Sequence, residues 1–67
     1  MQLTDIISRI ERDIKINEEL RKEYLDKWLE AVGKGDDVAS ACNHDLEMMT
    51  TGEILALKKT LEYLKNN

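Results

Sequence analysis

A long amphipathic stretch at the start of the chain ends at two closely spaced glycines, Gly33 and Gly35. With successive residues placed about 100° apart, as in an α-helix, its apolar side chains fall on one broad face. That face contains Leu3, Ile6, Ile7, Ile10, Ile14, Leu20, Tyr24, Leu25, Trp28, Ala31 and Val32. Glycine readily adopts the left-handed conformation that ends helices. The pattern predicts a helix over residues 4–32, with Thr4 capping its first turn.

A loop at residues 33–36 is expected to reverse the chain into a second helical region. Asp36 or Asp37 can cap the start of that region, and loops of about four residues commonly join antiparallel helices. A second apolar face over residues 38–66 contains Ala39, Cys42, Leu46, Met49, Ala56, Leu57, Leu61 and Leu64. The sequence therefore predicts an all-α fold, an antiparallel helical hairpin, as a single small helical domain over residues 1–67.

The segment MMTTGEIL, residues 48–55, carries signals of a helix start inside the second helical region. Thr50 and Glu53 have the spacing of a capping box, in which each side chain accepts a backbone N–H near a helix start. Met49 and Ile54 occupy the positions of the hydrophobic staple that accompanies such a cap. The two threonines and the glycine also lower helix propensity, glycine by about 1 kcal/mol relative to alanine.

We therefore predict a helix over residues 37–49, a bend or break near Met49–Thr51, and a third helical segment over residues 51–66. The apolar face keeps its phase through this segment. A continuous helix that contains unfavourable residues is the alternative.

A polar layer is predicted in the middle of the hairpin. Residues equally distant from a loop centred on Lys34 and Gly35 lie at the same height, which places Glu53 opposite Asn17. Arg21 follows Asn17 by one helical turn. We expect Arg21 to pair with Glu53 by charge-assisted hydrogen bonds, with Asn17 satisfying a remaining polar group. A buried layer of this kind can fix register or oligomeric state, and a solvated layer at the rim is the alternative.

The main packing contacts are predicted from the same alignment of the two helices. Trp28 and Tyr24 supply large aromatic areas near the loop. Met49, Leu57 and Leu61 lie on the opposing face. We expect these five residues to form the principal interaction and packing surface.

No catalytic residue is predicted. Cys42 is the only cysteine, and it points about 200° away from His44 on a helix, so the two cannot form an activated thiolate pair. A free cysteine on an apolar face is usually a small buried hydrophobic residue. The chain contains neither a glycine-rich phosphate loop nor an H-E-x-x-H arrangement. We expect no metal site, no cofactor and no enzymatic activity.

The charge distribution disfavours nucleic-acid binding. The formal net charge is −4, and residues 33–49 carry one basic and four acidic side chains. A helix-turn-helix over residues 37–66 is the alternative function, as a nucleic-acid-binding regulator. Its second helix, however, offers three lysines and no arginine for contact with phosphates.

The expected location is the cytoplasm. The chain start lacks the cationic and apolar segments of a secretion signal, and no run of roughly 18 apolar residues is present. We expect no membrane association.

The apolar residues exceed what a single seam between two helices requires. Those left over at or beyond the edges are Ile16, Leu29, Met48, Ile54 and Leu55. Surplus apolar surface on a small protein commonly marks a partner site. The sequence therefore predicts a small protein–protein interaction module, a regulator, inhibitor or adaptor. Its expected partner is a second copy, giving a homodimeric four-helix bundle, or another protein.

Overall fold

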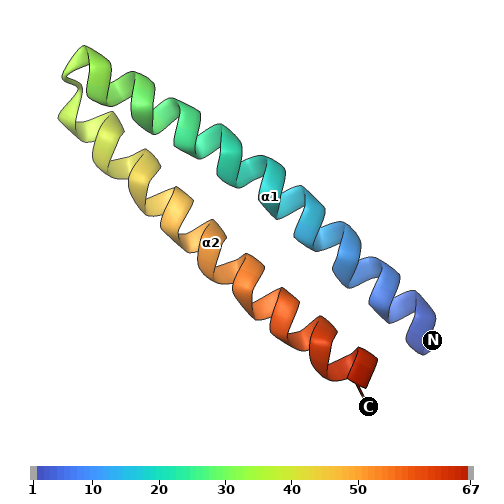
Figure 1. Cartoon of the computed structure of the whole chain (residues 1–67). Helices are drawn as coiled ribbons and strands as arrows, with labels where there is room; N and C mark the ends of the chain where they lie inside the picture. The colour runs from blue at the N-terminus through green and yellow to red at the C-terminus, as the bar shows by residue number, and fades with distance from the viewer. Residues whose placement is uncertain (1, 67) are drawn as a thin grey trace.

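The fold is a hairpin of two long antiparallel helices joined by a tight turn (Figure 1). It is seen in a computed structural model that describes residues 2–66. Helix α1 spans Leu3–Lys34 and helix α2 spans Asp37–Asn66. The helices lie side by side along a rod with principal extents of 49 × 14 × 14 Å. The predicted all-α antiparallel hairpin is confirmed.

Helix α1 begins without a side-chain cap. Gln2 is the N-cap residue, and its carbonyl oxygen accepts hydrogen bonds from the N–H groups of Asp5 and Ile6 at 3.0 and 3.2 Å. Thr4 lies inside the first turn, so the prediction that it caps the helix is wrong. The carboxylate of Asp5 lies in the first turn, where its negative charge interacts favourably with the positive end of the helix dipole.

The end of α1 is a Schellman motif built around Gly35. The φ angle of Gly35 is 71°, in the left-handed region where a Cβ atom is strained. Its N–H donates to the carbonyl oxygen of Val32 at 3.1 Å, and the Asp36 N–H donates to that of Ala31 at 2.9 Å. Gly33 still belongs to α1, so the turn is shorter than the loop that we predicted.

Asp36, which follows Gly35, caps the start of α2. Asp36 Oδ1 accepts a hydrogen bond from the Ala39 N–H at 3.0 Å, and its carbonyl oxygen accepts one from the Ser40 N–H at 2.9 Å. Of the two predicted caps, Asp36 is therefore the one that is used. Because the end of α1 and the start of α2 are determined at adjacent residues, the chain reverses sharply.

Helix α2 continues without interruption through residues 49–51, so the predicted bend or break is wrong. The hydroxyl groups of Thr50 and Thr51 donate to the carbonyl oxygens of Leu46 and Glu47, at 2.7 and 2.9 Å. Bonds to the residue four positions earlier are made inside a helix, whereas a capping threonine accepts a backbone N–H. The two threonines therefore belong to the helix interior.

The predicted hydrophobic staple is also absent at this segment. Met49 is 71% exposed, while Ile54 is only 6% exposed. Thr50 is buried as well, at 8%. Through residues 42–54, the face of α2 that packs on α1 is therefore shifted by one residue from the predicted face, toward Thr50 and Ile54, whereas Leu57, Leu61 and Leu64 are half-buried on the predicted face.

The seam between the helices follows the alternating three- and four-residue spacing of a coiled coil. On α1, its buried and half-buried residues include Ile7, Ile10, Ile14, Asn17, Tyr24, Trp28 and Ala31. On α2, they include Asn43, Glu47, Thr50, Ile54, Leu57, Leu61 and Leu64. Among the described residues, the buried apolar side chains are Ile14, Ala31 and Ile54, each still 6–7% exposed, so the core is thin.

Candidate interaction surface

A polar segment interrupts the middle of the seam, but its partners differ from the prediction. Arg21 Nε donates to Glu47 Oε1 at 3.2 Å, which forms an ion pair between the helices. Glu53 is exposed and takes no part in this pair. The Asn17 side chain donates to the carbonyl oxygen of Asp13 in its own helix, at 2.8 Å. The predicted pairing of Arg21 with Glu53 is therefore wrong.

Glu47 is the acceptor at the centre of this polar segment. Its Oε1 atom also lies 3.1 Å from the Thr51 hydroxyl, whose single proton is shared between this oxygen and the Glu47 carbonyl oxygen. The Glu47 side chain is 17% exposed, compared with 48% for that of Arg21. Hydrogen bonds from Arg21 and then from Thr51 hold the pKa of Glu47 below its ordinary value of 4.5, against the opposing effect of desolvation. Sequence reasoning missed Glu47 because its expected position lay beside the predicted seam.

The two predicted aromatic anchors lie at the seam and remain half-buried. The rings of Trp28 and His44 are 5.3 Å apart between centroids and tilted by 44°. Offset and tilted arrangements of this kind are favourable for aromatic pairs. Tyr24 instead lines a surface groove, together with Leu46. The aromatic residues therefore contribute packing area at the surface edges of the seam.

The groove lies beside the seam, near the middle of both helices. It is lined by Asn17, Leu20, Tyr24, Leu46, Met49, Thr50 and Glu53. Its volume is about 180 Å³. Sites for drug-sized ligands usually enclose about 300–1,000 Å³, so this groove is better suited to side chains of another protein. Of the predicted packing residues, Met49 borders this groove, whereas Leu57 and Leu61 are half-buried in the seam.

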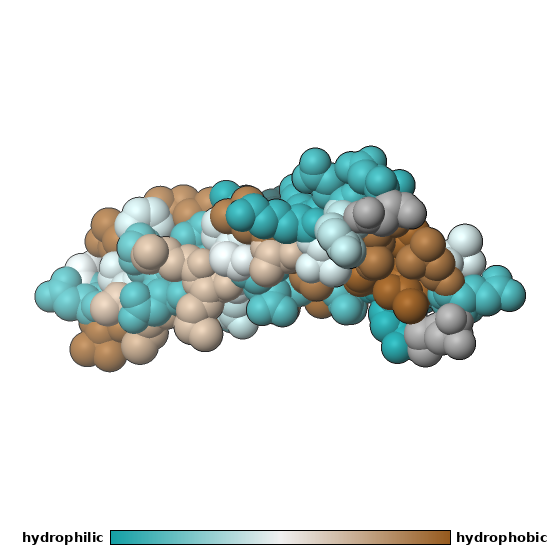
Figure 2. All heavy atoms as spheres, turned by 90° about the horizontal axis from the view of Figure 1, so that it is seen from below, coloured by the Kyte–Doolittle hydropathy of each residue, from teal (hydrophilic) through white to brown (hydrophobic). Residues whose placement is uncertain are grey.

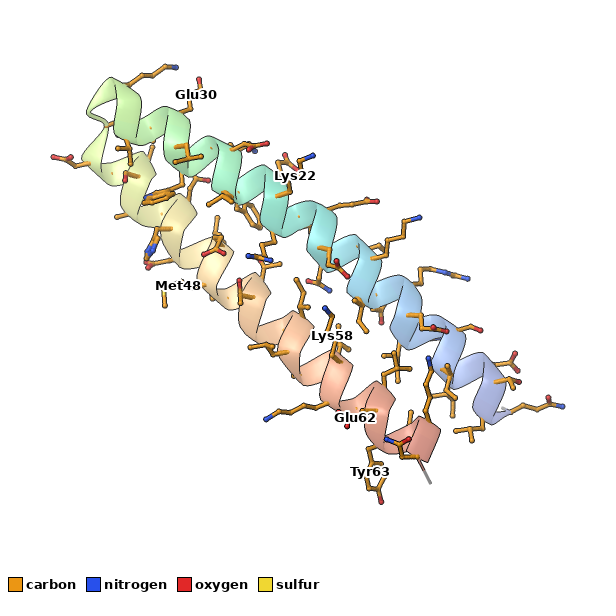
Figure 3. The ribbon with its side chains drawn as sticks, in the orientation of Figure 1. Lys22, Glu30, Met48, Lys58, Glu62 and Tyr63 are labelled. Atoms are coloured by element: carbon orange, nitrogen blue, oxygen red, sulfur yellow. The ribbon has the colours of Figure 1, made fainter. Side chains whose placement is uncertain are left out.

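Large apolar side chains are exposed along the whole rod. They are Leu3, Ile16, Leu20, Leu29, Val32, Val38, Leu46, Met48, Met49, Leu55 and Tyr63. Figure 2 shows hydrophobic side chains at the surface toward both ends of one face, and Figure 3 shows Met48 and Tyr63 projecting away from α1. The predicted surplus is confirmed for Ile16, Leu29, Met48 and Leu55, but Ile54 belongs to the core.

The groups considered for chemistry do not converge. Cys42 is an exposed thiol, so the prediction that it is buried is wrong. Within residues 2–66, no three His, Cys, Asp or Glu side chains are grouped to hold a metal ion. Across the same residues, neither helix combines the length and the apolar character needed to cross a membrane.

The comparisons with known proteins return no match: neither a protein-family model, nor a curated protein, nor a solved structure resembles this chain significantly. A simple hairpin fold does not by itself specify an activity.

Proposed function

We propose that this protein is a non-enzymatic protein–protein interaction module that acts through the apolar surfaces of its helices. Its first partner is a second copy of the same chain, and the assembly serves as a regulator, inhibitor or adaptor. The observation that carries the proposal is the large exposed apolar surface, set against a core of Ile14, Ala31 and Ile54. Extended apolar surface on a small protein is typical of an interaction site.

The total exposed area supports association. The hairpin exposes 5176 Å². A compact monomer of 7.8 kDa is expected to expose about 4,400 Å², so the hairpin exposes roughly 800 Å² more. A partner in a protein–protein interface of ordinary size buries about 800 Å². Burial of one such interface therefore removes the excess.

The elongated shape accounts for the excess area. The radius of gyration is 15.2 Å, compared with about 11 Å for a compact domain of this length. Two helices share a single seam, and their outer faces have no third element to pack on. Pairing two hairpins into a four-helix bundle gives each helix a second neighbour and encloses a common core.

Two observations favour protein contact over nucleic-acid binding. A helix-turn-helix needs a turn between two helices that cross at a large angle, and α2 is straight through residues 49–51. The net charge of −4 also opposes association with phosphates.

Sedimentation equilibrium over a concentration series tests this proposal. We expect the mass to rise from 7.8 kDa to twice that value, without larger species. Association through apolar contacts should persist at raised ionic strength, because salt screens charges and not apolar burial. Val38→Gln is the control: Val38 is 76% exposed beside the turn, and we expect the variant to dimerise like the parent. A mass of 7.8 kDa at every concentration contradicts self-association.

A further inference from the structure

We propose that two copies pack along the side of the hairpin that carries the groove, with their turns at opposite ends, so that α1 lies against α1 and α2 against α2. This inference rests on the proposed function and adds to it the contact face and the orientation. Three features support it: a cluster of exposed apolar residues beside the groove, a self-complementary line of charges, and the distribution of net charge along the rod.

The apolar cluster is defined by Ile16, Leu20, Leu46 and Met49, which we call the groove cluster. Leu20, Leu46 and Met49 border one groove, and Ile16 lies one helical turn from Leu20. Its four members come from both helices and lie near the middle of each. A two-fold axis through this region therefore brings the cluster onto its own copy, as an isologous interface requires.

The exposed apolar residues on the other side of the seam are more dispersed. Leu29 stands on a line of α1 that also carries Lys15 and Lys22, at seven-residue spacing. On α2, Met48 and Leu55 are followed along their line by Glu62. Charged side chains border both surfaces, but Lys15 and Lys22 have the same sign, whereas the two charges on the line through Leu20 have opposite signs.

A line of α1 beside the groove has a self-complementary charge pattern. Asp13, Leu20 and Lys27 follow one another at seven-residue intervals, so they share one line along the helix. Leu20 borders the groove, and Lys27 lines the neighbouring hollow toward the turn. When two α1 helices pack antiparallel with Leu20 at the centre, Asp13 of each copy faces Lys27 of the other. The arrangement forms this opposite-charge contact twice.

Within a single hairpin, Lys27 pairs only weakly, so its side chain can contact Asp13 of a second copy. Lys27 Nζ lies 3.1 Å from Glu23 Oε1, and both side chains are more than half exposed. An exposed pair within one helix contributes little stability, so it opposes the new contact weakly. With the turns at the same end, α1 instead meets α2 of the second copy. Lys27 then lies level with Cys42 and Asp13 lies level with Ala56, and neither of these two residues is charged.

The net charge of the two halves also favours turns at opposite ends. Residues 19–51, the half toward the turn, carry eight acidic and four basic side chains. Residues 2–18 and 52–66, the open half, carry six of each. Opposite orientation places the acidic half of one copy beside the neutral half of the other. With the turns at the same end, the two acidic halves lie together, within the range of about 8 Å over which charges interact at physiological salt.

Charge reversal tests the orientation. Asp13→Lys and Lys27→Asp should each weaken dimerisation by about tenfold, because each places like charges together at two symmetric contacts. The double variant exchanges the two charges and should restore a dissociation constant close to that of the parent. Circular dichroism checks that each variant remains helical. If the dissociation constant of the double variant rises by the product of the two single-variant fold-changes, the predicted contact is absent and the inference fails.

Two lysine substitutions test the contact face. Met49→Lys places a charge in the groove cluster and should shift the equilibrium to monomers. Leu55→Lys is the matched control, since Leu55 is also strongly exposed, at 57%, but lies outside the cluster. We expect Leu55→Lys to dimerise normally. The reverse result overturns the inferred face and leaves the proposed self-association standing.

The native Cys42 thiol gives a direct measurement of orientation. It is exposed and is the only cysteine, so one nitroxide label can be attached to each chain. From the rise of 1.5 Å per residue and a spacing of about 10 Å between helices, turns at opposite ends with Leu20 at the centre place the two Cys42 positions about 23 Å apart. Turns at the same end place them about 15 Å apart.

Pulsed electron paramagnetic resonance of the labelled dimer distinguishes these distances. Sedimentation of the labelled protein first checks that it still dimerises. A distance near 15 Å overturns the orientation but leaves self-association intact. If both the labelled and the unlabelled protein are monomeric at every concentration, this inference and the self-association in the proposed function are both overturned.

Discussion

At the scale of single residues, the neighbours Ile54 and Leu55 show how sharply burial changes along α2. Ile54 is 6% exposed and Leu55 is 57% exposed. We expect Ile54→Ala to lower the free energy of unfolding by about 2 kcal/mol or more, through lost burial and a cavity. Leu55→Ala should change it by less than about 0.5 kcal/mol. Urea unfolding of both variants at one protein concentration measures the difference, and equal effects contradict the observed seam.

Glu47 should make the stability of the hairpin depend on pH. Its folded-state pKa lies below 4.5 because Arg21 and Thr51 donate hydrogen bonds to the carboxylate. A carboxyl group with a lowered pKa stabilises the fold when it is ionised, and that contribution is lost as the pH falls through the folded-state value.

We therefore expect Glu47→Gln to be less stable than the parent at about pH 7 and to approach it below about pH 4. Urea unfolding at a series of pH values measures the difference. Glu53→Gln removes one negative charge without removing the ion pair between Arg21 and Glu47, and it serves as the control. A constant difference between Glu47→Gln and the parent across this pH range contradicts the assignment.

At the scale of elements, two glycines make opposite contributions. Gly35 has a φ angle of 71° at the end of α1, so Gly35→Ala should destabilise the hairpin by about 1 kcal/mol. Gly52 lies inside α2, and apart from its chain neighbours and the backbone of its own helix, a Cβ atom there would meet no atom within 4 Å. Gly52→Ala should therefore stabilise the hairpin by up to about 1 kcal/mol. Thermal unfolding gives the sign of each change, and destabilisation by Gly52→Ala argues against a continuous α2.

The helices themselves were predictable because their signals are local. The apolar period defined α1, Gly35 permitted its end, and Asp36 capped α2. The supposed break in α2 was not predictable from Thr50 and Glu53, because a threonine hydroxyl can either cap a helix or bond backward within one. The spacing of residues does not choose between those two bonds.

At the scale of the whole molecule, dimerisation should link stability to concentration. If folded hairpins pair and unfolded chains do not, mass action favours the folded state as the concentration rises. We expect the thermal midpoint of the parent to rise with protein concentration, as followed by circular dichroism. The midpoint of Met49→Lys should stay nearly constant. A parent midpoint that does not move with concentration contradicts coupled folding and dimerisation.

The candidate surface was only partly predictable, because it depends on how the two helices pack and not on local sequence alone. The surplus of apolar residues could be counted from the sequence, and Ile16 and Leu55 were correctly placed outside the seam. The residues that border the groove depend on how α2 is rotated about its axis. A shift of one residue near the middle of α2, about 100°, places Thr50 inward and Met49 outward, while Leu57 and Leu61 keep their predicted positions.

Helix α1 and the site where the chain reverses follow from local sequence, since they depend on residues within a turn or two of one another. Packing between the helices sets which face of α2 meets α1 and pairs Arg21 with Glu47 rather than Glu53. Two straight helices pack best when burial is shared along the whole seam. A polar Thr50 is therefore buried in line with Ile54, while the more apolar Met49 is left at the surface.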